Sequence, residues 1–199
     1  MKLSQVLTAA VLTAVLAVPA LAQNPAAVKV KGKIEAADAN SITVKTNDGA
    51  TKVGITDKTK VLTIGKGTLA DLKKGSYVGV GAMPQADGSQ KAIRVMIFAE
   101  SQRGTGEGSR PWDKPNTTMT NATVDTTVSG VEGQVLTVKY KDGEKKIIVG
   151  SDAVILLRTD GTPSDLKPGA NVDIAAATKK PDGSLETARV DVGRGDFAP

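Results

Sequence analysis

The sequence predicts an all-β protein made of two tandem small OB-like β-barrels, each with one short helical turn. Three observations lead to this fold class. One segment of the chain is repeated, short runs alternate apolar and polar residues, and Asp-Gly pairs separate those runs. Alternation with a period of two is typical of strands with one buried face, and Asp-Gly pairs are typical of tight hairpin turns.

The repeat sets the organisation of the chain. Three blocks recur in the same order, at offsets of 94, 94 and 95 residues: residues 41–49 match 135–143, residues 69–75 match 163–169, and residues 87–95 match 182–190. A self-similar segment of this length is one structural unit used twice. Small units bury only about 60% of their unfolded surface, so we expect the two copies to pack on each other.

The elements of the first copy follow in order along the chain. Strands are predicted at residues 28–34, 41–45, 51–55, 61–64, 77–80 and 91–97, with turns at Asp48-Gly49 and Asp87-Gly88. Residues 69–75 carry two leucines three positions apart and end in a glycine, which predicts one helical turn. The second copy predicts strands at residues 123–131, 134–140, 145–149, 153–157, 171–175 and 185–192, with a helical turn at 164–168.

Five or six short strands with one helical turn inserted late in the order favour a closed barrel of the OB type. Closure also removes the exposed strand edges of a chain rich in Val, Ile and Thr. A β-sandwich remains the alternative, because periodicity does not separate the two folds.

The N-terminus has the pattern of an export signal. Residues 1–22 carry Lys2, an apolar stretch over 6–18 and then Ala20-Leu21-Ala22, which predicts cleavage before Gln23. The apolar stretch is shorter than the ~20 residues that span a bilayer, so no membrane span is expected. The domains expected are a signal peptide (1–22), a first OB-like domain (23–100), a linker (101–122) and a second OB-like domain (123–199), in a periplasmic or secreted protein.

The linker holds the only tryptophan of the chain, Trp112, between Pro111 and Asp113. A large indole gains free energy when its apolar surface is buried. We therefore expect these three residues to dock between the two barrels, the alternative being a side chain exposed in a flexible segment.

Six stretches of the chain resemble a family of uncharacterised exported bacterial proteins with tandem OB-like β domains, a domain of unknown function. They are residues 83–88 (MPQADG), 103–108 (RGTGEG), 111–113 (PWD), 119–123 (MTNAT), 139–143 (KYKDG) and 177–183 (ATKKPDG). The resemblance implies a fold and a compartment, and it implies no activity.

The composition excludes several kinds of chemistry. The chain has no histidine and no cysteine, so it has no Ser-His-Asp or Cys-His catalysis and no imidazole or thiolate metal site. Ser164 and Lys167 match the S-x-x-K spacing, but the first copy has Ala70 at the position of Ser164, which is better explained as the cap of the helical turn. We expect no catalytic residue, cofactor or metal site, with calcium binding through carboxylates left open.

The charges also bear on partners. The formal net charge is +5, with basic and acidic residues interspersed, and aromatic residues are few, so no nucleic-acid partner is expected. The function expected is a non-catalytic exported binding or structural module of the cell envelope, which presents a groove to a peptide, glycan or protein. The alternative is a glycan-acting enzyme that uses carboxylates alone, and two or more carboxylates in one pocket would favour it. The oligomeric state is left open.

Overall fold

Strands dominate the structure. The computed structural model describes residues 27–130 and 133–199, where the regular elements are strands and short 3-10 turns. The all-β prediction is therefore confirmed. The predicted signal peptide lies outside the described residues. Within the described part of the chain, no helix has the length and apolar character needed to cross a membrane.

The elements follow the predicted order closely. The first copy of the repeat contains β1 (Ala27–Ala37), β2 (Ser41–Thr46), β3 (Gly49–Gly54), β4 (Lys60–Lys66), η1 (Leu69–Asp71), β5 (Tyr77–Pro84) and β6 (Gln90–Ile97). Between the copies lie η2 (Glu100–Gln102) and β7 (Gly108–Pro111). The second copy contains β8 (Thr118–Gly130), β9 (Gly133–Tyr140), β10 (Gly143–Val149), β11 (Val154–Asp160), η3 (Pro163–Asp165), β12 (Asn171–Lys179), β13 (Leu185–Thr187) and β14 (Arg189–Gly193).

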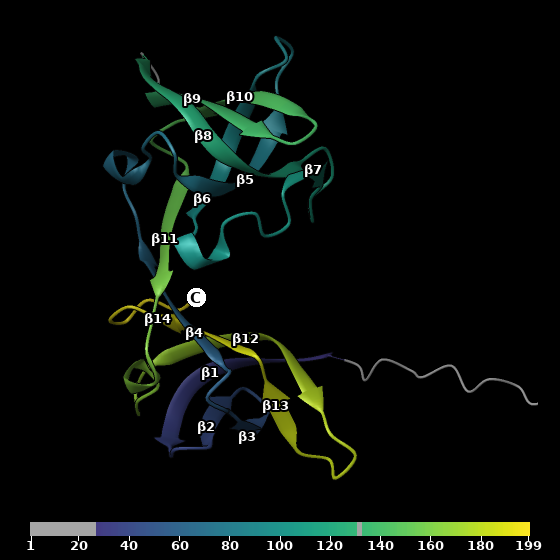
Figure 1. Ribbon diagram of the computed structural model, residues 1–199, viewed down its shortest axis with the longest axis vertical. Helices are drawn as coiled ribbons and strands as arrows, with labels where there is room; N and C mark the ends of the chain where they lie inside the picture. Colours follow the sequence, from purple (N-terminus) through teal and green to yellow (C-terminus); the bar gives the residue numbers. More distant parts are fainter. Residues whose placement is uncertain (1–26, 131–132) are drawn as a thin grey trace, which may run out of the picture.

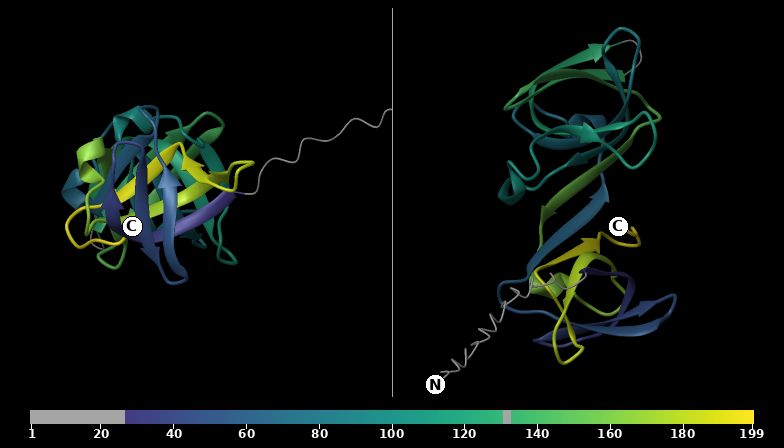
Figure 2. Two further views of the ribbon diagram at one scale, coloured as in Figure 1. Left: turned by 90° about the horizontal axis from the view of Figure 1, so that it is seen from below. Right: turned by 90° about the vertical axis from the view of Figure 1, so that its right-hand side faces the viewer.

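Strand pairing divides the molecule into two lobes, which lie one above the other along the long axis (Figures 1 and 2). In one lobe, the pairings run from β5 through β6, β10, β9 and β8 and return to β5. We call this closed set of strands the central ring, because it uses the middle of the chain. A closed five-stranded barrel confirms a barrel in place of a sandwich. In the other lobe, the pairings run from β1 through β2, β3, β13 and β12 and return to β1, and we call this set the terminal ring.

Each ring takes three of its five strands from one copy of the repeat and two from the other. The colours in Figure 1 show this directly, because the terminal ring combines purple and yellow strands from the two ends of the chain. Its core packs Val44 and Val53 from the first copy against Ile174 and Val190 from the second. The core of the central ring likewise joins residues of β5 and β6 to residues of β8, β9 and β10. The boundaries of the two cores therefore do not follow the boundaries of the repeats.

Two strands of seven residues, β4 and β11, connect the rings (Figure 1). β4 and β11 pair antiparallel with each other, and each also pairs in parallel with one neighbour, β14 or β6. In the register of β4 and β11, Ile64 lies opposite Arg158. These two residues are 94 positions apart, which is the offset of the repeat around them. The two copies are thus related by an approximate two-fold axis that passes through this pair.

The predicted turns have the geometry that the sequence indicates. Gly88 and Gly183 have φ values of +82° and +83°, which glycine adopts without steric strain. In the first of these turns, the Asp87 carboxylate accepts hydrogen bonds from the backbone N–H and the hydroxyl of Ser89, at 2.9 and 2.6 Å. These hydrogen bonds lower the pKa of Asp87. Asp182 and Ser184 repeat the same contacts in the second copy.

Both predicted helical turns are present as 3-10 turns, η1 and η3. The sequence analysis assigned the cap of the second turn to Ser164, and this was wrong. The cap is Thr162, whose backbone N–H donates to the Asp165 carboxylate at 2.7 Å, while Ser164 lies inside the turn. Pro163 takes the first helical position, where its missing N–H has no partner to lose.

Candidate functional site: a cleft on the outer face of the central ring

The cleft is built on two glycines of β5. Val78, Val80 and Ala82 face inward and are buried in the core of the central ring. Because successive side chains of a strand point to opposite faces, Gly79 and Gly81 face outward. β5 therefore contributes no side chain of its own to this face, and Phe98 and Trp112 pack over Gly79 and Gly81 within a cleft that has a volume of about 300 Å³.

The register of the neighbouring strands places the other lining residues beside the glycines. Gly79 is paired with Met96 of β6 and with Asn121 of β8. Gly81 is paired with Arg94 and with Met119, and Met119 is in turn paired with Arg110 of β7. Residues paired in this way share one face of the sheet. Phe98, Trp112, Asp113 and Arg158 complete the lining.

Trp112 is half-buried and lies against Gly81. A Cβ atom added at Gly81 would come within 2.4 Å of the indole Cζ3 atom, so the ring occupies the space that a side chain would need. Pro111 is exposed at the end of β7, paired with Thr118, and Asp113 is exposed at the cleft. The three residues predicted to dock between the barrels are thus together on the central ring, and their role in holding the two lobes remains a prediction.

Three arginine side chains reach the cleft, and they differ in the number of hydrogen bonds and ion pairs that their guanidinium groups form. Arg94 is exposed and takes part in no hydrogen bond or ion pair among the described residues. Arg110 donates one hydrogen bond, from Nη1 to the carbonyl oxygen of Gly106 at 2.9 Å. Arg158 is almost buried and forms an ion pair with Asp191. Asp113 contributes the one carboxylate of the lining, so the cleft carries an excess of positive charge.

Two buried polar atoms of the lining have no hydrogen-bond partner among the described residues, Oδ1 of Asn121 and Nε of Arg158. Nδ2 of Asn121 donates to the carbonyl oxygen of Thr105 at 3.0 Å, which fixes the orientation of the amide. Tyr77 donates its hydroxyl proton to the same carbonyl, also at 3.0 Å. The loop before β7 is therefore held against the cleft by two side chains. Burial raises the pKa of Tyr77, so its hydroxyl stays protonated as a donor.

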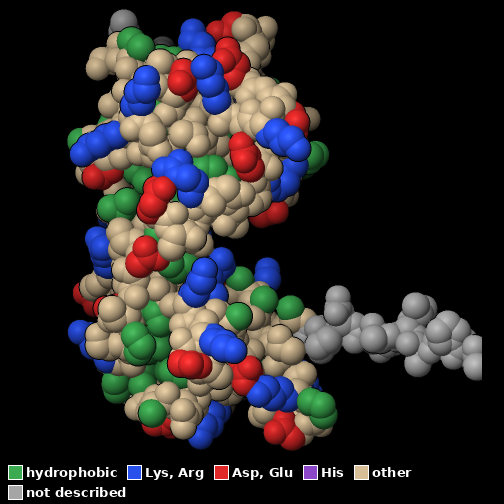
Figure 3. Space-filling view, viewed as in Figure 1, with side chains coloured by type: hydrophobic (Ala, Val, Ile, Leu, Met, Phe, Trp, Pro, Cys, Tyr) green, Lys and Arg blue, Asp and Glu red, His purple; other side chains and the backbone are tan. Residues whose placement is uncertain are grey.

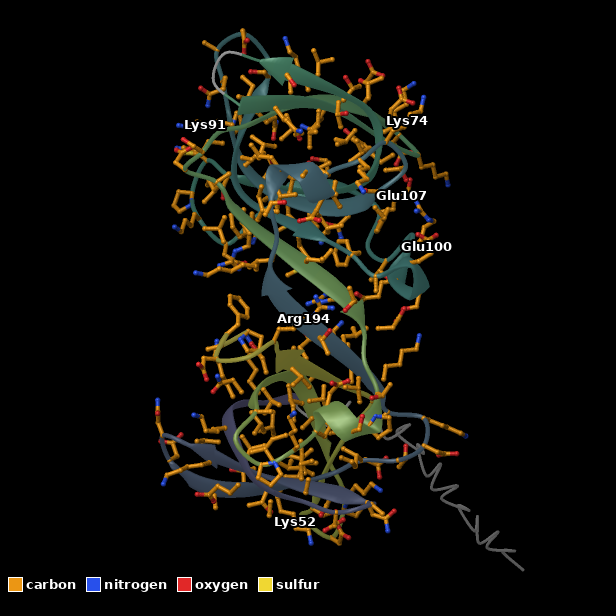
Figure 4. The ribbon with its side chains drawn as sticks, turned by 90° about the vertical axis from the view of Figure 1, so that its left-hand side faces the viewer. Lys52, Lys74, Lys91, Glu100, Glu107 and Arg194 are labelled. Atoms are coloured by element: carbon orange, nitrogen blue, oxygen red, sulfur yellow. The ribbon has the colours of Figure 1, made fainter. Side chains whose placement is uncertain are left out.

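Arg158 connects the cleft to β14, which pairs with β12 of the terminal ring. Its guanidinium lies over the ring of Phe98, 5.6 Å from the centroid, and its Nη2 donates to Oδ2 of Asp191 at 3.0 Å. Burial raises the pKa of Asp191, against the opposing effects of Arg158 and of Arg189 at 3.5 Å. Arg194, which Figure 4 shows between the two lobes, donates to the hydroxyl of Thr159 at 2.6 Å. The junction between the lobes is therefore polar and hydrogen-bonded.

A second hollow, at the terminal ring, contains two carboxylates, Asp38 and Glu186. Asp38 accepts hydrogen bonds from the Ser41 hydroxyl at 2.7 Å and from the backbone of Asn40 at 2.8 Å, and the hydrogen bond from Ser41 contributes most to lowering its pKa. Glu186 forms an ion pair with Lys180. A general acid for glycan cleavage needs a raised pKa, and Asp38 has the opposite shift.

The remaining charges do not define another site. Basic and acidic side chains are interspersed over the face of the molecule in Figure 3, without a block of one sign. Asp165 and Asp196 line a further hollow near the C-terminus, and Asp165 is bonded to the backbone of Thr162. Within the described residues, no group of three or more acidic side chains is placed to hold a metal ion.

Sequence reasoning named Trp112 and its two neighbours but missed the glycines and arginines around them. A usable signal was present, because the second copy has Asp173 and Ala175 where the first has Gly79 and Gly81. Two glycines on one face of a predicted strand leave that face open. A comparison of the copies position by position would have singled out β5.

The comparisons with known proteins give one match. A family model described as a domain of unknown function (DUF5666) matches residues 31–96. These residues run from β1 to β6, so they cover the first copy of the repeat, whose strands the structure divides between the two rings. No curated protein matches the chain. No solved structure matches it either.

Proposed function

We propose that this protein is a non-catalytic binding or structural module of the cell envelope, built from two OB-like barrels, whose ligand site is the cleft on β5, β6 and β8. The observation that carries the proposal is the combination of a half-buried indole packed over Gly81 and a guanidinium without a partner among the described residues, together in one concave place. Binding sites typically combine an apolar concave lining with a few polar groups that orient the ligand.

The export signal in residues 1–22 supports a place in the envelope, as a periplasmic or secreted protein. A peptide, a glycan or a protein of that compartment would be the partner. The small cleft favours recognition of one chemical group at a time, since about 300 Å³ is at the lower end of ligand pockets.

The test compares three forms of the mature chain, which begins at Gln23. The wild type, Arg94→Gln and Lys74→Gln are immobilised and exposed to a detergent-solubilised envelope fraction, and the retained peptides, proteins and glycans are identified. Lys74 is the matched control, because its exposed side chain loses the same charge and lines neither the cleft nor the hollow at Asp38 and Glu186. The proposal expects a retained component that is lost with Arg94→Gln and kept with Lys74→Gln. Equal retention by all three forms would contradict it.

The carboxylate-dependent enzyme is the second candidate, favoured by Asp38 and Glu186 in one hollow. Its test is the appearance of new reducing ends when envelope glycans are incubated with the wild type. Activity that is lost with Asp38→Asn or Glu186→Gln would support the enzyme. The absence of new reducing ends with the wild type would exclude it for the glycans tested.

A further inference from the structure

The cleft interrupts the two-fold relation between the copies of the repeat. Val78 and Val80 of β5 correspond to Val172 and Ile174 of β12, and all four are buried core residues. The shared fold therefore explains the inward positions. The outward positions differ between the copies, and these are the ones that line the cleft.

At these outward positions, apolar residues of the first copy correspond to an acidic residue and a glycine in the second. Met96 and Phe98, apolar side chains of the cleft, correspond to Asp191 and Gly193. Arg158 lies opposite its own counterpart, Ile64. Since the terminal lobe forms with Asp191 and Gly193 at these positions, the shared fold does not require Met96 and Phe98. A role in binding accounts for these two side chains.

The cationic groups of the cleft point to an oxyanion. A guanidinium presents parallel N–H donors that match carboxylate, phosphate and sulfate groups, and hydrogen bonds between charged partners are the stronger kind. All N–H donors of the Arg94 side chain are free among the described residues, whereas Arg110 uses one donor on the carbonyl oxygen of Gly106. In the order of the strands from β6 to β7, Gly81 and Met119 lie between Arg94 and Arg110.

The apolar groups of the cleft point to a compact ring beside that oxyanion. The indole of Trp112 stands over Gly81, with Met96 and Met119 on the neighbouring strands. A flat aromatic side chain of this kind packs against the apolar face of a sugar ring. The floor strands β5, β6 and β8 are paired along both edges, so the floor offers no free edge to the backbone of an extended peptide, whereas β7 at one side of the cleft pairs with β8 alone.

We propose that the cleft binds an oxyanion-bearing sugar residue of an envelope polysaccharide, with the oxyanion on Arg94 and Arg110 and the ring against Trp112. This inference rests on the proposed function and names its ligand class. The shared chemistry is an anionic sugar, and its oxyanion is a carboxylate, a phosphate or a sulfate.

The test uses the emission of Trp112, the only tryptophan, as the mature protein is titrated with defined probes. The probes are an oligogalacturonate for carboxylate, a heparin oligosaccharide for sulfate, a mannose-6-phosphate oligosaccharide for phosphate, a neutral dextran oligomer and inorganic phosphate. We expect saturable changes with at least one anionic sugar and none with dextran. Arg94→Gln should weaken that binding about tenfold or more, which is the loss of one charge-assisted hydrogen bond, and Lys74→Gln should leave it unchanged.

Four results would overturn the inference: equal binding of dextran, equal affinity for inorganic phosphate, binding that Arg94→Gln leaves intact, or no binding of any anionic sugar. The last result is distinguishable from a failure of the proposed function. If the envelope fraction still yields a component whose retention depends on Arg94, the cleft binds a different class of ligand. If it yields none, the proposed function fails as well.

Discussion

A single methyl group at Gly81 tests the architecture of the cleft. In Gly81→Ala, the new Cβ atom would lie 2.4 Å from Cζ3 and 2.6 Å from Cη2 of Trp112. Both distances are far below van der Waals contact, so the indole must leave its position on β5. Overpacking of this kind costs typically about 1–3 kcal/mol, and the smaller backbone entropy of alanine in the unfolded chain offsets about 0.4–1 kcal/mol. We expect a net loss of about 1–2 kcal/mol.

The matched control is Gly65→Ala in β4. The nearest atom to its Cβ would be Cδ of Arg194 at 3.2 Å, in a long side chain that can move. This variant should therefore stay within about 0.5 kcal/mol of the wild type. Urea unfolding followed by far-UV circular dichroism gives the two free energies. Emission of Trp112 should shift to longer wavelength in Gly81→Ala alone. If both variants were equally stable with unchanged emission, the indole would not lie on Gly81 and the reasoning would be refuted.

The junction between the lobes gives two further predictions. Arg158→Met leaves the buried carboxylate of Asp191 with only the more distant Arg189 as a partner. The variant should therefore lower the free energy of unfolding by about 3 kcal/mol in urea at neutral pH, and the double variant Arg158→Met/Asp191→Asn should recover most of this loss. Equal stability of the single variant and the wild type would contradict a buried ion pair. Burial raises the pKa of Asp191, so the folded protein holds this proton more readily than the unfolded chain. The stability that this proton contributes is fully present below the pKa of the unfolded chain and is lost as pH rises through the raised pKa of the folded protein. The difference in unfolding free energy between wild type and Asp191→Asn should therefore change in that direction as pH rises from the usual range of an aspartate, and a difference independent of pH would be inconsistent with the raised pKa.

Local sequence signals predicted the elements of this fold well. The alternation of Val28 to Ile34 predicted β1, and the Asp-Gly pairs predicted the hairpin turns with their positive φ values. The first helical turn lies where the leucine spacing and the following glycine indicated, and the second lies at the matching place in the second copy. These features depend on residues close to one another in the chain. The sequence therefore contains them in readable form.

Local signals failed where the structure depends on distant contacts. β7 lies in the expected linker and was not predicted, because Gly108 to Pro111 has no apolar alternation and owes its conformation to pairing with β8. No short-range sequence pattern indicates that the strands of each repeat are divided between two cores either. The residues of β4 would read as a strand in the same way whether it closed onto its own copy or paired with β11.

The candidate site was predicted in part for the same reason. Trp112 stood out as the one large aromatic side chain of its segment, and the structure places it in the cleft. Arg94, Arg110 and Arg158 come from three strands, and only the register of β5, β6, β7, β8 and β11 brings them to one place. An arginine on an exposed strand face is ordinary in a sequence. Its partners become visible once the strands are paired.

The central claim is that the two repeats complete each other, so that each ring, and the cleft with it, is assembled from both. A protease site inserted between Lys114 and Pro115, in an exposed turn, allows the folded mature chain to be cut between the repeats. The cut leaves β1 to β7 on one fragment and β8 to β14 on the other, and every ring contains strands of both. The account predicts that the two fragments elute together in size-exclusion chromatography under native conditions and separate only in denaturant. Two folded fragments that elute separately without denaturant would contradict it.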